Sequence, residues 1–485
     1  MVKADYFVQF KNIRQYQNDL VSNKTDCSTA VEHYLKQIED AENLNAFVEV
    51  FAHESILRAK QLDEERKNGK PLGLLHGVIV AIKDVICYKD HCVTAASNIL
   101  KGFKSLYSST AVKKLLEEDA IIIGRCNCDE FAMGSTNENS CYGSVLNALD
   151  ETRVPGGSSG GSAVAVQAGL CMSSLGSDTG GSVRQPADFC GILGFKPGYG
   201  KISRYGLIAY ASSFDQIGIF GNSVEDVALV MKVISGADEY DSTVSFNGVE
   251  KDSDDSDQFK RPVIAYFKNA LEHHSLDPEI KQQIYSLVEQ LKIDGYTVAP
   301  LNFELLEYLV PTYYVLTTAE ASSNLLRYDG IRFGAVKETD ETNLTKFYTN
   351  NRSTGFGKEV KRRIMLGTFV LSAGYYDAYF TKAQQVRRIL CEETNAIFKK
   401  FDVLILPTVP STAFRINEIS KDPIAMYLAD IYTVFANLAG IPGISVPLFK
   451  HSNGLPFGLQ VMSNKFNELT LLKLSNRLLT DYKRY

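Results

Sequence analysis

The sequence has no tryptophan and only seven histidines among its 485 residues. Three of these, His273, His274 and His451, follow the glycine- and serine-rich stretch that dominates the chain, and none lies in a recognisable motif. A serine hydrolase of the nucleophile-elbow type needs an acid and then a histidine downstream of its serine. The scarcity of histidine therefore argues against that chemistry.

Other absences exclude further classes of protein. No uninterrupted apolar run reaches the ~18 residues of a membrane span, and the N-terminus carries no apolar core of a secretory signal. With 51 basic and 57 acidic residues, the net charge of −6 argues against a chain that wraps nucleic acid directly. We expect a cytoplasmic protein without a membrane contact, although a partner could still bind nucleic acid.

The nine cysteines are scattered and odd in number. Cys126 and Cys128 are separated by one residue, which is not the spacing of a zinc site, and no His-x-x-x-His accompanies them. Reduced, buried cysteines are typical of a cytosolic protein. We expect no metal site in this chain.

Apolar and helical patterns alternate along the chain, which predicts a layered α/β architecture. A capping box at Thr29 and Glu32 predicts the start of one helix. The acidic segment 250–257 reads as a solvated loop, and no linker or repeat divides residues 1–485, so we expect one domain. Buried strands are expected at 78–82, 120–124, 263–267, 403–407, 443–447 and 457–462, and helices at 54–68, 108–118, 163–172, 223–234, 278–292, 357–399 and 467–481.

Two glycine- and serine-rich blocks, residues 156–162 and 176–182, are the most distinctive part of the sequence. Dense glycines allow a close backbone approach and a positive φ. Successive N–H groups in such a loop can bind an anion or a developing oxyanion. Serine hydroxyls can act as nucleophiles or pass on a proton.

Four interpretations of these blocks compete. A phosphate-binding P-loop lacks its Gly-Lys-Ser ending, and a dinucleotide fingerprint lacks its glycine spacing. Residues 156–160 match a nucleophile elbow but have no histidine partner, and a flexible linker would not continue between apolar segments. The fourth interpretation is a Ser-Ser-Lys site, in which Lys83 ends the apolar strand 78–82. Burial would lower the pKa of such a lysine and make it a base.

These motifs resemble the amidase signature family. The resemblance runs from Lys83 through Gly156–Ser162 and Gly176–Ala187 to Gly191–Pro197. It implies one amidase signature domain, with a large mixed β-sheet covered by helices on both faces. Within this domain it implies a helical region at about 1–70 and a catalytic core at about 71–220. Gly198 and Ala148 depart from the usual pattern, but neither is one of the residues proposed for catalysis.

The resemblance also implies the roles of individual residues. Ser182 is the acylated nucleophile, Ser158 follows a cis peptide bond and relays the proton, and Lys83 is the base. The oxyanion hole is expected from the backbone N–H groups of Thr179, Gly180, Gly181 and Ser182. Asp178 and Arg184 flank this loop and are expected to support it.

Within the family, the chain most resembles the glutamine-hydrolysing subunit of the bacterial Glu-tRNA(Gln) amidotransferases, over nearly its whole length. Glutamine carries an α-ammonium and an α-carboxylate, which need partners of opposite charge. The resemblance implies Asp430 for the ammonium and an arginine of the pair Arg362 and Arg363 for the carboxylate, and we favour Arg363. Tyr314 is a further candidate for the pocket, with a plain core tyrosine as its alternative.

The resemblance implies a heterotrimer. This chain would hydrolyse glutamine, and ammonia would pass to a second subunit that uses ATP, Mg²⁺ and Glu-tRNA(Gln), with Asp-tRNA(Asn) as a second candidate substrate. A small third subunit would brace the pair, and no cofactor is expected in this chain. The alternatives are a stand-alone amidase of the same fold and a noncatalytic scaffold subunit.

Overall fold

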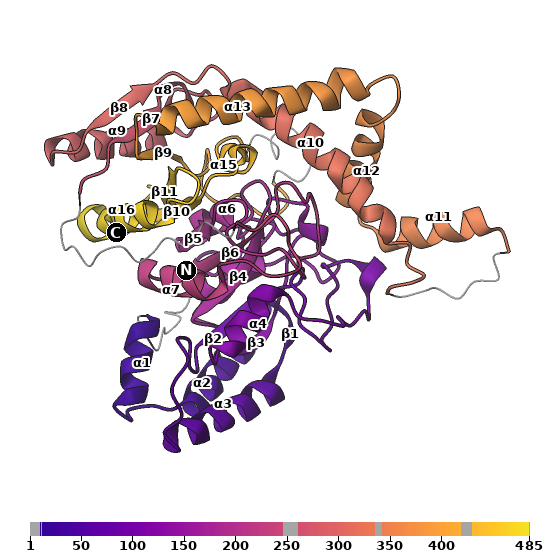
Figure 1. Ribbon diagram of the computed structural model, residues 1–485, viewed down its shortest axis with the longest axis vertical. Coiled ribbons are helices and arrows are strands. Elements are labelled where there is room, and N and C mark those ends of the chain that lie inside the picture. The colour runs from indigo at the N-terminus through magenta and orange to yellow at the C-terminus, as the bar shows by residue number, and fades with distance from the viewer. Residues whose placement is uncertain (1–9, 11, 246–259, 335–341, 419–428, 485) are drawn as a thin grey trace.

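The computed structural model describes residues 10, 12–245, 260–334, 342–418 and 429–484. Within them, eleven strands form one sheet in the order β1-β3-β2-β4-β6-β5-β10-β11-β9-β7-β8 (Figure 1). The strands are β1 (Phe47–Val50), β2 (Ile79–Lys83), β3 (Ile121–Cys126), β4 (Ser173–Asp178), β5 (Leu193–Lys196), β6 (Gln216–Gly221), β7 (Ile264–Phe267), β8 (Val298–Leu301), β9 (Val403–Pro407), β10 (Gly443–Lys450) and β11 (Pro456–Ser463).

The sheet is mixed. β2 pairs in parallel with β3 and β4, and β7 pairs in parallel with β8 and β9, while the strands between these groups are antiparallel. β2, β3 and β9 are buried at every residue, which explains their continuous apolar runs. β5 from the first half of the chain pairs with β10 from the second half, so both halves contribute to the same sheet.

Helices cover both faces of the sheet, as expected (Figure 1). α4 and α16 each pack on α7, α5 packs on α6, and α10 packs against α12, α13 and α15. The helices are α1 (Ile13–Val21), α2 (Cys27–Asp40), α3 (Ala52–Lys67), α4 (Thr110–Glu117), α5 (Gly160–Gln167), α6 (Arg184–Cys190), α7 (Val224–Ile234), α8 (Lys268–Leu271), α9 (Pro278–Ile293), α10 (Leu309–Asn324), α11 (Leu344–Gly355), α12 (Lys358–Val370), α13 (Lys382–Phe398), α15 (Val434–Ala439) and α16 (Glu468–Tyr482).

Three sequence-based expectations need correction. The cap of α2 is Asp26, whose side chain accepts the N–H of Thr29 at 2.7 Å, so Thr29 is not the capping residue. The expected helix over 357–399 is divided: α12 ends at Val370, and a π-turn (Asp377–Thr381) precedes α13. The region 1–70 is not purely helical, because it contains β1. The acidic segment 250–257 lies outside the described residues.

All nine cysteines are free. Across the described ranges, no helix combines the length and apolar character that a membrane span needs. The same ranges contain no group of three or more His, Cys, Asp or Glu side chains that could hold a metal ion.

The aromatic core beside β7 yields a stability prediction. Phe267 is fully buried, stacks on Phe303 at a centroid distance of 4.4 Å and meets the edge of Phe435 at 5.4 Å. Phe267→Ala should lower the free energy of unfolding by about 3–5 kcal/mol, because it leaves a cavity. The measurement is the urea midpoint, with Leu326→Ala as the control because Leu326 is 71% exposed. Equal midpoints for wild type and Phe267→Ala would contradict this packing.

Candidate active site

Lys83 lies at the end of β2, buried among three serine hydroxyls. Its Nζ is 2.7 Å from Oγ of Ser158, 2.9 Å from Oγ of Ser159 and 2.9 Å from Oγ of Ser177. Burial lowers the pKa of Lys83 to about 8, against the opposing influence of Cys128 and of nearby carboxylates. The amine is therefore partly neutral near physiological pH and can accept a proton.

The hydrogen bonds distinguish Ser158 from its neighbour. The hydroxyl of Ser159 donates to the carbonyl of Ser177 at 3.0 Å, so Ser159 can only accept a hydrogen bond from Lys83. A neutral amine has one lone pair, and the hydroxyl of Ser158 can donate to it at 2.7 Å. The geometry therefore suits Ser158 as a proton relay better than Ser159.

The loop that carries Ser158 rests on Asp129. The Gly157–Ser158 peptide bond is cis, and the carbonyl of Ser158 accepts the N–H of Asp129 at 3.1 Å. The Asp129 carboxylate accepts the N–H groups of Asn137 at 2.9 Å and Asn139 at 3.0 Å. A Cβ on Gly157 would lie 2.2 Å from this carboxylate, so only glycine fits there. Burial raises the pKa of Asp129 to about 6.

Ser182 lies in the tight loop between β4 and α6. The carbonyl of Ser182 accepts the N–H of Ser159 at 3.3 Å, which places the two serine loops side by side. Gly181 has φ +132°, and a Cβ there would lie 2.3 Å from Oγ1 of Thr433. The hydroxyl of Thr433 donates to the carbonyl of Gly180 at 2.6 Å. The loop is therefore held by contacts on more than one side.

The carboxylate of Asp178 supports the same loop. It accepts the N–H of Gly181 at 2.9 Å and of Val183 at 3.2 Å, and forms a buried ion pair with Arg184 at 2.9 Å. Burial alone would raise the pKa of Asp178, but the Arg184 guanidinium holds it at about 2. Because Asp178 already binds the N–H of Gly181, the expected oxyanion donors reduce to Thr179, Gly180 and Ser182.

Asp430, Tyr314 and Arg363 lie together in a second buried group. The hydroxyl of Tyr314 donates to Asp430 at 2.9 Å, and the Arg363 guanidinium lies 5.4 Å from the centroid of the Tyr314 ring. Ser135 also donates to Asp430, at 3.2 Å. Burial raises the pKa of Asp430 to about 7, while Tyr314 and Arg363 act in the opposite direction. Tyr314 is thus a polar member of this group as well as a core residue.

The structure separates the two candidate arginines. The side chain of Arg363 is 3% exposed and that of Arg362 is 33% exposed. Both pair with Glu359, one turn earlier on α12, and Arg363 also donates to the hydroxyl of Tyr210 at 2.8 Å. Only Arg363 belongs to the buried group, which agrees with the choice made from the sequence.

The charged group adjoins the nucleophile loop. Thr433, which holds the carbonyl of Gly180, also donates its N–H to the carbonyl of Asp430 at 3.1 Å. A Cβ on Gly180 would lie 2.4 Å from the ring of Tyr313, the neighbour of Tyr314 on α10. The charged group and the loop of Ser182 are therefore neighbours, joined through Thr433 and Tyr313.

Sequence reasoning missed further residues of this site, among them Asp129, Ser135, Ser159, Ser177, Tyr210 and Thr433. Asp129 and Ser177 carried a usable signal, because they lie at or just after the carboxyl ends of β3 and β4, where α/β proteins place functional groups. Ser159 lies in the block 156–162, and the others lie in loops or on short helices that only the tertiary fold brings to the site.

Comparison with known proteins decides the family. A family model described as Amidase matches residues 29–472. The chain belongs to the amidase family. This amidase is 46% identical over 473 residues to a glutamyl-tRNA(Gln) amidotransferase subunit of Chlorobium phaeobacteroides, and the match covers 96% of this chain and 98% of the relative.

Two solved structures share the fold of this amidase. The crystal structure of a glutamyl-tRNA(Gln) amidotransferase subunit from Thermotoga maritima has a TM-score of 0.80 and 38% identity, and the match covers 99% of this chain and 96% of that one. The native peptide amidase from Stenotrophomonas maltophilia has a TM-score of 0.81 and 25% identity, and the match covers 99% of each chain.

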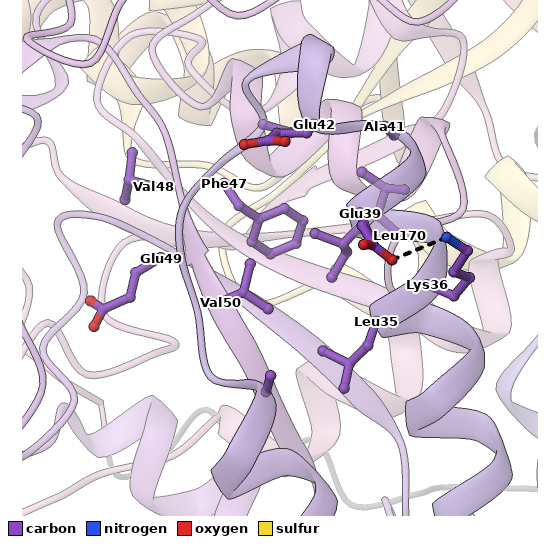
Figure 2. A pocket seen from close by; sticks show the side chains of 13 residues that line it. Leu35, Lys36, Glu39, Ala41, Glu42, Phe47, Val48, Glu49, Val50 and Leu170 are labelled. Carbon is purple, nitrogen blue, oxygen red and sulfur yellow. Dashed lines mark hydrogen bonds and ion pairs between the residues drawn. The ribbon is translucent and has the colours of Figure 1, made fainter.

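The amidase also has a hollow of about 600 Å³ at the β1 edge of the sheet (Figure 2). Leu35, Phe47 and Leu170 form part of its apolar lining, and Lys36 pairs with Glu39 at its rim at 3.0 Å. No residue of the Lys83 site lines it, and its lining contains no serine or cysteine.

The environment of Lys83 predicts a pH dependence. Because the base must be the neutral amine, amide hydrolysis should increase as pH rises through about 8. Lys83→Ala should lose about 100-fold or more at pH 7, as is typical for removal of a general base, and should recover partly as pH rises. The measurement is the rate between pH 6 and pH 10, with Lys101→Ala as an exposed-lysine control. Wild-type turnover by Lys83→Ala at pH 7 would remove lysine from the mechanism.

Proposed function

We propose that this chain is the glutamine-hydrolysing subunit of a tRNA-dependent amidotransferase. The observation that carries the proposal is the buried pair of opposite charges, Asp430 and Arg363, which lies beside the loop of Ser182. The names of relatives that match almost the full length of the chain support it independently.

The charged pair suits a free α-amino acid. Asp430 can bind the α-ammonium of glutamine and Arg363 its α-carboxylate, since charge-assisted hydrogen bonds are the strongest that such groups form. Tyr314 contacts both residues. An aryl or fatty amide has no such charges, so it would leave Asp430 without an ionic partner, which is costly for a buried carboxylate, and would make no use of Arg363.

In the proposed reaction, Oγ of Ser182 attacks the side-chain amide carbon of glutamine, and its proton passes through Ser158 to Nζ of Lys83. The N–H groups of Thr179, Gly180 and Ser182 stabilise the oxyanion that forms. The proton returns by the same route to the amide nitrogen, and ammonia leaves. Water then attacks the γ-glutamyl ester, and glutamate is released.

We further propose that the ammonia passes to a second subunit, which uses it to convert Glu-tRNA(Gln) into Gln-tRNA(Gln). Asp-tRNA(Asn) is a second candidate substrate. ATP, Mg²⁺ and tRNA would be bound mainly by that subunit, which is consistent with the net charge of −6 on this chain. A third, small subunit would brace the pair.

One observation favours a second candidate function. The peptide amidase of similar fold matches 99% of this chain, so a stand-alone amidase that acts on another amide is the alternative. A noncatalytic scaffold would be expected to lose its reactive groups, whereas Lys83 and Ser158 are in hydrogen-bond contact here. Reaction of Ser182 with a sulfonyl fluoride distinguishes the scaffold from both enzymes.

Removal of either charge tests the substrate. Arg363→Gln and Asp430→Asn should each raise the KM for glutamine by about 10- to 100-fold, because a hydrogen bond to a charged group contributes roughly 1.5–3 kcal/mol. Arg362→Gln is the matched control on the same helix and should leave KM little changed. Steady-state kinetics on glutamine measure the effect. Full glutamine turnover by both charge variants would make glutamine the wrong substrate.

The coupling to tRNA is tested on the complex. Ammonia release from glutamine by the co-purified subunits should rise sharply when ATP and Glu-tRNA(Gln) are added, and Ser182→Ala should abolish it. Release measured with each component omitted provides the controls. If the chain purifies alone and releases ammonia from other amides but not from glutamine, it is a stand-alone amidase.

A further inference from the structure

We propose that Asp215 is a positioning residue that links two parts of the site. One is the loop from Thr179 to Ser182, here called the oxyanion loop, and the other is Arg363, which would bind the substrate carboxylate. The inference rests on the proposed function, because it assigns Arg363 to the carboxylate of glutamine. Asp215 makes no hydrogen bond to Lys83, Ser158 or Ser182 among the described contacts. It would act through Thr179 on one side and Tyr210 on the other.

The first link runs to the oxyanion loop. Asp215 immediately precedes β6, whose first residue, Gln216, pairs with Asp178 at the end of β4. The turn before β6 and the loop after β4 therefore lie side by side. Oδ1 of Asp215 accepts the hydroxyl of Thr179 at 2.7 Å. Thr179 begins the loop that ends at Ser182, so this bond fixes the start of the oxyanion hole.

The second link runs to Arg363. Oδ2 of Asp215 accepts the N–H of Tyr210 at 2.9 Å and of Ala211 at 3.0 Å. The hydroxyl of Tyr210 accepts Nη1 of Arg363 at 2.8 Å, and its ring centroid lies 5.4 Å from the guanidinium. Tyr210 is 1% exposed. The backbone position of Tyr210 therefore helps to set where the guanidinium lies.

A carboxylate is needed for both links at once. Asp215 is 3% exposed and accepts hydrogen bonds on both of its oxygens, from one hydroxyl and two backbone N–H groups. An asparagine offers only one acceptor oxygen. Its amide nitrogen is a hydrogen-bond donor and would face either the hydroxyl of Thr179 or the backbone N–H groups of Tyr210 and Ala211, which are also donors. Asp215→Asn would therefore break one link or both, although the side chain keeps its size.

The two links predict different kinetic effects on glutamine hydrolysis by the full chain with its partner subunits. Thr179→Val should lower kcat by about five- to tenfold with KM little changed, because it removes one hydrogen bond to the oxyanion loop. Tyr210→Phe should raise KM by about tenfold with kcat little changed, because it removes a hydrogen bond to a charged group. Asp215→Asn should show one of these effects or both, according to which link its amide group breaks.

Asp241→Asn is the matched control. Asp241 is also a carboxylate that accepts backbone N–H groups, those of Arg204 and Thr243, and its side chain is 7% exposed. It pairs with Arg204 and lies outside the Lys83 site and its charged group. Its substitution should leave kcat and KM unchanged. If Asp215→Asn leaves both constants unchanged, the proposal is wrong.

A second measurement does not depend on glutamine. Phenylmethanesulfonyl fluoride reacts with a nucleophilic serine, fluoride leaves, and the reagent has no carboxylate for Arg363. Thr179→Val should slow this reaction, and Tyr210→Phe should not; Asp215→Asn should slow it if its kcat on glutamine is also lowered. If wild type does not hydrolyse glutamine, the proposed function fails, while this pattern still tests the oxyanion link of Asp215.

The single-hydroxyl variants keep the proposal testable if Asp215→Asn does not fold. Thr179→Val replaces one hydroxyl by a methyl group, and Tyr210→Phe removes one hydroxyl. A thermal melt shows whether each variant folds as wild type does. Equal changes in kcat and KM from either variant would overturn the assignment of separate links.

Discussion

The burial of the Lys83 amine is the constraint on which the rest of the site depends. In the described structure its hydrogen-bond partners are three serine hydroxyls, which solvate the amine without supplying a formal negative charge. This arrangement lets the proton leave near neutral pH, whereas a carboxylate at the same distance would hold it. It also requires that β2 and β4 lie side by side, so that Lys83 and Ser177 meet at one edge of the sheet.

The site contains two pairs of oppositely charged residues, and the two are built differently. Asp178 and Arg184 are both fully buried, bind each other directly and are surrounded by further hydrogen-bond partners, so they form a rigid support. Asp430 and Arg363 are also buried, but they share no ion pair among the described contacts, and Tyr314 contacts each of them. A pair without a direct ion pair is the arrangement that the proposed binding of a zwitterion needs.

The sequence predicts best those features that depend on residues close together in the chain, and it misses those that depend on contacts between distant segments. Lys83 could be proposed because it ends an apolar strand, and the two glycine- and serine-rich blocks because each is contiguous in the chain. Ser158 and Ser182 were singled out within these blocks by the resemblance to the amidase signature family. Tyr210 and Asp215 could not be proposed, because their roles depend on contacts with Arg363, Thr179 and the pairing of β4 with β6. The break between α12 and α13 was also missed, because the helical pattern continues across it. The cap of α2 was misplaced by three residues, because Asp26 and Thr29 both suit that position.

Arg184 also donates to the carbonyl of Thr433 and the side chain of Asn437, and it binds Gln460 on β11. The support of the Ser182 loop thus reaches β11, the last of the described strands in chain order. During synthesis, the residues proposed for catalysis have all been made by position 182, yet the loop lacks these contacts until β11 has emerged. A growing chain therefore contains the side chains proposed for amide hydrolysis before it has the contacts that align them. Proteolytic fragments of the first half lack the same contacts.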